Sequence, residues 1–214
     1  MMTWVPGHIV RHRFDHATAR QMGVVLAALH EHASTFHSVR IPKGIVADRV
    51  VYFGDTSKLA AYQSTNGSMF VEAIDRVQSY LDALWKSPPH RPHLLHGDFG
   101  THNIMRHRGR LSPIDFQDLQ FGFDLQDAAI TITDLRRQFS DESLVDALKD
   151  GYNSIRPWPL NDVRVERALA AARSLNVINL GLNLRRPGLF EFLDRHTAVV
   201  ANWMSGLEPK TPLI

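Results

Sequence analysis

A polar loop that leads into a predicted β-hairpin constrains the fold of this chain more than any other feature. The loop, with the sequence HGDFGTHN, spans residues 96–103. Two segments rich in strand-forming residues follow it, at residues 103–106 and 111–116, and the four residues between them favour a turn. Strands joined by so short a connection pair in antiparallel fashion. The sequence therefore predicts a two-stranded ribbon with the polar loop at its start.

The register of this ribbon decides which polar side chains meet. If Arg106 and Leu111 flank the turn, antiparallel pairing places Asn103 opposite Ile114. Asp115, the next residue, then lies beside Asn103 at the open end of the ribbon. Magnesium prefers oxygen ligands and usually takes one or two carboxylates together with phosphates and water. We expect Asp115 and Asn103 to bind a magnesium ion.

Asp98 lies in the loop that leads to this end of the ribbon. A carboxylate in that place suits the removal of a proton from a hydroxyl group. Phosphoryl transfer needs an aligned acceptor, a base for its proton and cations over the phosphate oxygens. The spacing HxDxxxxN, followed by an apolar–Asp–aromatic segment, meets these needs. The sequence therefore favours phosphoryl transfer with Asp98 as the catalytic base.

Three motifs resemble those of the aminoglycoside phosphotransferase/choline kinase-like family. They are HGDFGTHN, PIDFQD at residues 113–118 and GFDLQDAA at residues 122–129. Leu26–His30 also resembles the family's LAxLH segment, and Met2–Gly7 resembles the hinge that follows its small lobe. Members of the family have a protein-kinase-like fold and use ATP to phosphorylate hydroxyl groups of small molecules.

The resemblance implies an α+β, predominantly helical fold. This fold would be a protein-kinase-like C-terminal lobe in which a small β-hairpin carries the catalytic and metal-binding loop. Residues 1–214 would form this lobe, with residues 1–7 as a remnant of the hinge. The implied cofactors are ATP and Mg²⁺, and the implied partner is a small-molecule hydroxyl acceptor.

The resemblance also assigns roles to individual residues. Asp98 would be the catalytic base, and Asn103 and Asp115 would bind magnesium. The backbone of Trp4 and Val5 would contact adenine at the hinge.

Two further residues are expected to support the catalytic loop. His96 would pack and hydrogen-bond beneath the metal-binding aspartate, and Asp127 would anchor the loop from the helix that follows. Asp118 is left open between a surface acid and a group near the metal ligands.

The chain departs from the family pattern before the hinge. The family places there a β-rich lobe with a loop over the ATP phosphates and a lysine that holds them, and neither Lys43 nor Lys58 has a strand context. Because several charge contacts to the nucleotide would be lost together, we expect little kinase turnover from these residues alone. The alternative is a non-catalytic remnant or pseudokinase-like binding module, with self-association through the face that a small lobe would cover.

Other side-chain patterns carry weaker hypotheses. Glu191 and Asp194 are candidates to meet an amine on the acceptor, against the alternative of a solvated helix face. A metal-dependent hydrolase that uses His96 and Asp98 is a further alternative, and it predicts bound zinc and no dependence on nucleotide. Histidines spaced by four residues near the N-terminus lack the acidic partner of a helical zinc site.

Helical periodicity accounts for most of the remaining chain. Asp15 can cap a helix over residues 16–32, and a second helix begins at Asn66 or Ser68 and ends before Pro88. The later helices are expected at residues 124–139, 142–152, 162–185 and 188–205.

Composition bounds the classes of function. The net charge is +2 and the basic residues are scattered, so the sequence predicts no nucleic-acid partner. There is no cysteine, no apolar run near the ~20 residues of a membrane helix and no signal-peptide pattern at the start. We therefore expect a cytoplasmic protein without a membrane partner.

Overall fold

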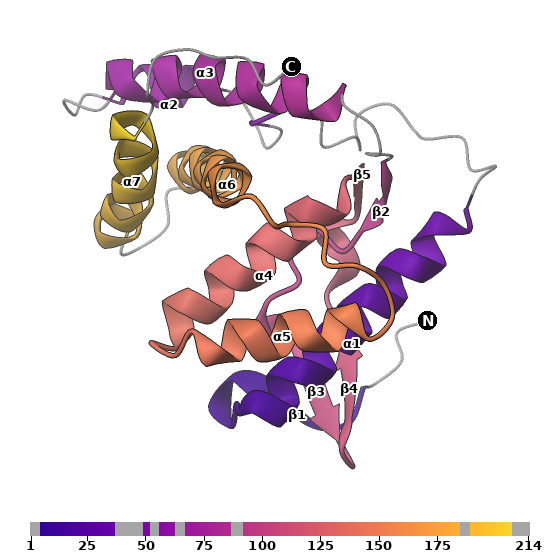
Figure 1. The fold of residues 1–214 in the computed structure, drawn as a ribbon. Helices are drawn as coiled ribbons and strands as arrows, with labels where there is room; N and C mark the ends of the chain where they lie inside the picture. The colour runs from indigo at the N-terminus through magenta and orange to yellow at the C-terminus, as the bar shows by residue number, and fades with distance from the viewer. Residues whose placement is uncertain are drawn as a thin grey trace. The chain divides into compact units, whose positions relative to one another are not determined.

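The computed structural model describes residues 5–36, 49–51, 56–62, 67–86, 92–184 and 189–206. The chain divides into two units, Met1–Val46 with Arg91–Asn161 and Ala47–His90 with Asp162–Ile214. The expected α+β, predominantly helical fold is confirmed (Figure 1). The assignment of residues 1–214 to one lobe stays a prediction.

The first unit is built around two helices that lie side by side, α1 (His16–Ser34) and α5 (Ser143–Asn153) (Figure 1). The carboxylate of Asp15 caps α1 by accepting the backbone N–H of Thr18 at 2.7 Å. The two helices approach closely at Gly23 and Gly151, where a Cβ atom would overlap a backbone carbonyl of the facing helix. A third helix, α4 (Asp124–Gln138), packs with them.

Two small antiparallel sheets complete the first unit. One has the order β1 (His8–Ile9), β3 (Ile104–His107) and β4 (Arg110–Pro113), and the other pairs β2 (His93–Leu95) with β5 (Gln120–Gly122). In the second sheet each strand contributes only three residues. The polar loop of residues 96–103, in which the catalytic base is predicted, runs between β2 and β3, so both of its ends are tied to a sheet.

The second unit contains α2 (Ser57–Ala60), α3 (Gly67–Trp85), α6 (Val163–Leu184) and α7 (Leu189–Ser205). Helix α6 packs against α3 and α7. Its buried residues include small, apolar and amide side chains, among them Asn176 and Asn179, which are fully buried. The side chain of Phe192 on α7 packs against His196 with ring centroids 4.7 Å apart.

The helices expected from periodicity are present, with ends within about two residues of the predicted ones. The first strand, β1, follows Pro6 and Gly7. None of the described helices combines the length and the apolar character that a bilayer crossing requires.

Candidate active site

The catalytic loop closes on itself through a single turn of 3₁₀ helix at Thr101–Asn103. The backbone N–H of Gly100 donates to the carbonyl of Asp98, and that of Asn103 donates to the carbonyl of Gly100, both at 2.9 Å. This turn brings the side chain of Asn103 back to Asp98. The Asn103 amide nitrogen donates to the backbone oxygen and to Oδ2 of Asp98, at 3.0 Å each.

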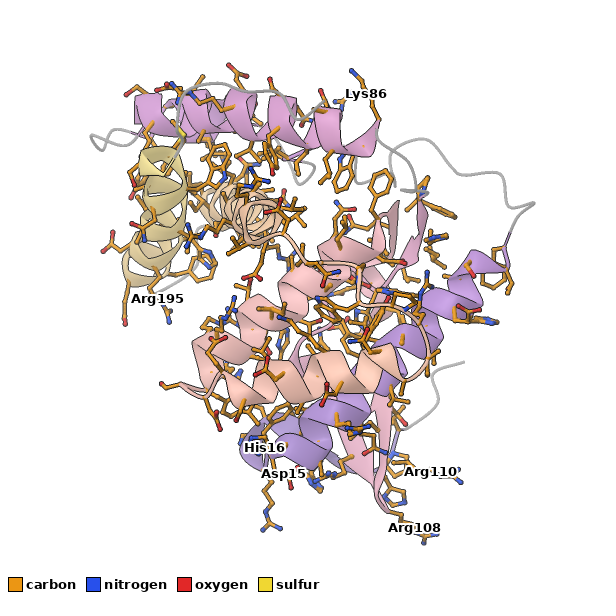
Figure 2. The ribbon with its side chains drawn as sticks, viewed as in Figure 1. Asp15, His16, Lys86, Arg108, Arg110 and Arg195 are labelled. Carbon is orange, nitrogen blue, oxygen red and sulfur yellow. The ribbon has the colours of Figure 1, made fainter. Side chains whose placement is uncertain are left out.

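The hairpin has the register that the sequence predicts. Arg106 pairs with Leu111, and the backbone N–H of Ile114 donates to the carbonyl of Asn103 at 2.9 Å. Figure 2 shows Arg108 and Arg110 at the turn, so Asn103 lies at the opposite end of the ribbon.

Asp115 follows at that same end, and its backbone is unusual. Its φ of 61° and ψ of 63° place it in the left-handed region, which costs a non-glycine residue roughly 1–2 kcal/mol. Its side chain is exposed and makes no hydrogen bond or ion pair with the other residues that the structure describes. The carboxylate is therefore available to a ligand from solution.

His96 is buried beneath the loop and hairpin. Its Nε2 lies 3.0 Å from the carbonyl oxygen of Ile114, and its Nδ1 lies 3.4 Å from the backbone N–H of Asp98. The ring also packs against Phe99 and Phe116, with centroids 5.6 and 4.6 Å away. Both ring nitrogens of His96 therefore face backbone groups, and its expected support of the loop and the hydrolase alternative both stay predictions.

Helix α4 holds the loop with three polar side chains on one face. Asp127 accepts the backbone N–H groups of His96 and Gly97, both at 2.9 Å. One turn further on, the Thr131 hydroxyl donates to the carbonyl of Phe99 at 2.8 Å. The spacing of i, i+4 puts these groups on the same side of the helix.

The third of these side chains is Asp134, one further turn along α4. It accepts the backbone N–H of Thr101 at 2.6 Å and the hydroxyl of the same residue at 2.7 Å. Arg137 donates to its other oxygen at 2.6 Å. Asp127, Thr131 and Asp134 are each at most 4% exposed, so the loop rests on a buried and satisfied polar face.

Asp127 is itself supported by a buried group from α1 and α5. His30 lies between Asp127 and Tyr152. The Nε2 atom of His30 is 3.4 Å from Oδ2 of Asp127, and its Nδ1 atom is 2.8 Å from the hydroxyl oxygen of Tyr152. Burial, together with the nearby Asp124 carboxylate, raises the pKa of Tyr152 far above its usual range, so its hydroxyl stays protonated. Arg156 pairs with Asp124 at 2.9 Å.

His102 touches the predicted base directly. Its Nε2 lies 3.1 Å from Oδ2 of Asp98, and about one third of its side chain is exposed. The hydrogen bond to Asp98 raises the pKa of His102 more than partial burial lowers it. The neighbouring Asp98 carboxylate thus stabilises the charged imidazole relative to a free histidine side chain.

Sequence reasoning missed Thr131, Asp134, Tyr152 and His102. For the first two there was a signal, because polar residues spaced by three and four interrupt the otherwise apolar face of α4. His102 lies inside the loop motif itself but in one of its unspecified positions. Tyr152 is 122 residues from its partner His30, and no local pattern links them.

The remaining predicted residues belong to other segments of the chain. Trp4 falls outside the described residues, and Val5 is half-buried ahead of β1. Glu191 and Asp194 are exposed on α7 of the second unit. Asp118 is half-buried, and its backbone carbonyl lies so close to Gly97 (φ 80°) that a Cβ atom there would overlap it. The roles of these residues stay predictions.

The donor set suits a hard divalent cation better than zinc. Asn103 and Asp115 offer oxygen atoms, which magnesium prefers, whereas zinc in proteins is bound mainly by nitrogen and sulfur ligands. A cation held by two side chains leaves room for phosphate oxygens and water, which is the usual arrangement for magnesium in phosphoryl transfer.

Comparison with protein families gives a match over most of the chain. The model described as "Phosphotransferase enzyme family" matches residues 1–169, which include every element of the catalytic loop and hairpin. A search of characterised proteins by sequence gives no significant match.

Solved structures with the same fold are similar over nearly the whole chain. An amicoumacin kinase in complex with AMP-PNP, Ca²⁺ and its antibiotic has a TM-score of 0.71 at 15% identity, covering 93% of this chain and 63% of that one. A microcompartment-associated aminopropanol kinase has a TM-score of 0.64 at 17% identity, covering 89% and 61%. A choline kinase from Cryptosporidium parvum has a TM-score of 0.66 at 14% identity, covering 94% and 69%. The chain thus spans less than two thirds of the length of the first two.

Proposed function

Because the chain belongs to the phosphotransferase enzyme family, we propose that it carries the catalytic base and metal ligands for ATP-dependent phosphorylation of a small-molecule hydroxyl group. The observation that supports this most directly is the cluster at the open end of the hairpin. There Asn103 hydrogen-bonds Asp98, and the exposed Asp115 follows the residue opposite Asn103.

Asp98 is the proposed base. In the reaction its carboxylate takes the proton of the acceptor hydroxyl while the hydroxyl oxygen forms a bond to the γ-phosphorus and the bond to ADP breaks. Asp98 is about one quarter exposed, so a hydroxyl group from solution can reach it, whereas Asp127 on α4 holds the backbone N–H of the preceding residue, Gly97. A base that is both accessible and held in place is the requirement for such a proton transfer.

Asn103 and Asp115 are the proposed ligands of magnesium. The Asn103 amide nitrogen is engaged with Asp98, which leaves the carbonyl oxygen of the same amide as its metal ligand. The exposed Asp115 carboxylate is the second ligand. Magnesium held there supplies positive charge over the phosphate oxygens of ATP.

The proposed acceptor carries a hydroxyl group, and the relatives suggest which compounds to test first. The structurally similar proteins are named as kinases of amicoumacin, aminopropanol, spectinomycin and choline. These acceptors combine hydroxyl groups with amines or ammonium groups. Amino alcohols and amine-bearing antibiotics are therefore the first panel, with Glu191 and Asp194 as proposed contacts for the positive charge.

Single-turnover transfer from γ-³²P-labelled ATP, with protein in excess and Mg²⁺ present, tests the function. We expect a labelled product with at least one acceptor of the panel. Asp98→Asn should slow its formation by about 10²–10⁴-fold, because general base catalysis contributes that much. Asp75→Asn is the control, since Asp75 is exposed on α3 and far from the loop in sequence. The proposal is wrong if no acceptor is labelled or if Asp98→Asn is as fast as wild type.

A further inference from the structure

We propose that His102 is a positioning residue that fixes the orientation of the Asp98 carboxylate through its Nε2. This inference rests on the proposed function, in which Asp98 is the base. His102 occupies a position in HGDFGTHN to which neither the motif chemistry nor the family match assigns a role.

Two donors converge on one oxygen of Asp98. Nε2 of His102 lies 3.1 Å from Oδ2, and the Asn103 amide nitrogen lies 3.0 Å from the same atom. A carboxylate with a single contact can still rotate about its Cβ–Cγ bond, whereas a second donor on the same oxygen restricts that rotation. Consecutive residues of the 3₁₀ turn supply both donors, so the turn itself sets the orientation of the base.

The imidazole of His102 occupies the space that a side chain at position 100 would enter. A Cβ atom on Gly100 would lie 2.5 Å from Cε1 and 2.8 Å from Nδ1 of His102, both closer than such contacts occur. The φ of Gly100 is −114°, a value that any residue adopts. A side chain at position 100 would therefore displace the His102 ring without straining the backbone.

The far side of the ring faces a buried carboxylate. Nδ1 of His102 is 3.8 Å from Oδ1 of Asp134, which is 4% exposed. Asp134 is fixed in turn by Thr101 and Arg137. The ring thus lies between two carboxylates, with its hydrogen-bonding nitrogen directed to Asp98 and its other nitrogen toward a fixed negative charge. If the His102 ring only filled space, its two nitrogens would not need to face carboxylates.

The variants separate hydrogen bonding from packing. His102→Leu keeps most of the volume and removes the donor, whereas His102→Gln can present an amide N–H near the position of Nε2. Gly100→Ala keeps the imidazole and moves it away from Asp98. His107→Leu is the matched control, because His107 is exposed at the hairpin turn and pairs only through the backbone with Arg110.

The first measurement needs no turnover: the ¹³C resonance of the Asp98 side-chain carboxyl in the full chain without ligands. We expect it to shift in His102→Leu and in Gly100→Ala, to return toward the wild-type position in His102→Gln, and to stay unchanged in His107→Leu. If His102→Leu and Gly100→Ala leave this resonance unchanged, the positioning role is wrong.

The second measurement is the rate of phosphoryl transfer. We expect the single-turnover rate to fall by about 10- to 100-fold in His102→Leu and Gly100→Ala with little change in the ATP concentration that gives half of the full rate, because a small misplacement of a catalytic group has an effect of that size. His102→Gln should recover most of the rate. An equal loss in the Leu and Gln variants would assign His102 to packing alone. A wild-type chain that transfers no phosphoryl group would contradict the proposed function, whereas the carboxyl resonance would still decide the role of His102.

Discussion

Replacing Asp127 with alanine should destabilise the catalytic loop and the unit around it. The carboxylate is fully buried and accepts the backbone N–H groups of His96 and Gly97 at 2.9 Å each. Hydrogen bonds to a charged group contribute about 1.5–3 kcal/mol each, and alanine would leave both N–H groups buried without an acceptor. The variant also loses the longer contact between the Asp127 carboxylate and Nε2 of His30, at 3.4 Å, which adds a smaller loss of stability. We expect Asp127→Ala to lower the free energy of unfolding by about 3–5 kcal/mol.

Urea denaturation of purified wild type and variants measures this loss directly. Asp127→Asn keeps one acceptor oxygen but places an N–H₂ group against a backbone donor, so its loss should be intermediate. Asp75→Ala, an exposed aspartate in the middle of α3, should change the stability by no more than about 0.5 kcal/mol. Faster hydrogen exchange at the Gly97 amide in Asp127→Ala would locate the effect in the loop. A loss below about 1 kcal/mol for Asp127→Ala would refute the claim that this carboxylate holds the loop.

Two further predictions concern α1 and its packing. Gly151→Ala should lower the free energy of unfolding by about 1–3 kcal/mol, because the added Cβ would overlap the Arg20 carbonyl on α1. This loss should exceed the gain from the better helix propensity of alanine. Equal or higher stability of Gly151→Ala in thermal denaturation would contradict this close approach. Asp15 caps α1 through Thr18, and these hydrogen bonds hold the pKa of Asp15 below its usual value of 3.8. The contribution of the charged Asp15 to the free energy of unfolding should therefore be complete above pH 3.8 and lost as the pH falls through the lowered pKa. Asp15→Asn also caps the helix but does not titrate, so its stability should lack this contribution to the pH dependence. Parallel stability profiles for the two proteins between pH 2 and 5 would show that the cap does not titrate.

The local elements of the fold could be predicted because their signals lie within a few residues of one another. Asp15 marks the start of α1, and the four-residue turn between Arg106 and Leu111 fixes the hairpin register. The hairpin register in turn places Asn103 and Asp115 at one end of the ribbon. The spacing of residues along the sequence was sufficient to predict this pairing, since the paired residues of the hairpin are close in sequence.

The nonlocal contacts could not be predicted in the same way. The sheet of β2 and β5 pairs His93 with Gly122, and three-residue strands so far apart carry no distinguishing pattern. The support of Asp127 by His30 and Tyr152 depends on the packing of α1 against α5. That packing requires glycines whose importance is visible only when the facing helix is in place.

Asp134 illustrates a residue that lies between these two cases. Its position on α4 follows from helical spacing, but its partner Thr101 depends on how the loop lies across the helix. A polar residue on a buried helix face indicates that a partner exists, because an unsatisfied carboxylate would be too costly there. The sequence alone does not identify that partner.

The central claim is that Asn103 and Asp115 form one site for a divalent cation beside Asp98. Electron paramagnetic resonance of Mn²⁺, titrated into the protein in the presence of ATP, tests it without requiring turnover. We predict that wild type and Asp75→Ala bind Mn²⁺ with the same affinity and that Asp115→Ala binds it at least about tenfold more weakly, since one carboxylate ligand is lost. Unchanged Mn²⁺ affinity in Asp115→Ala would contradict the account.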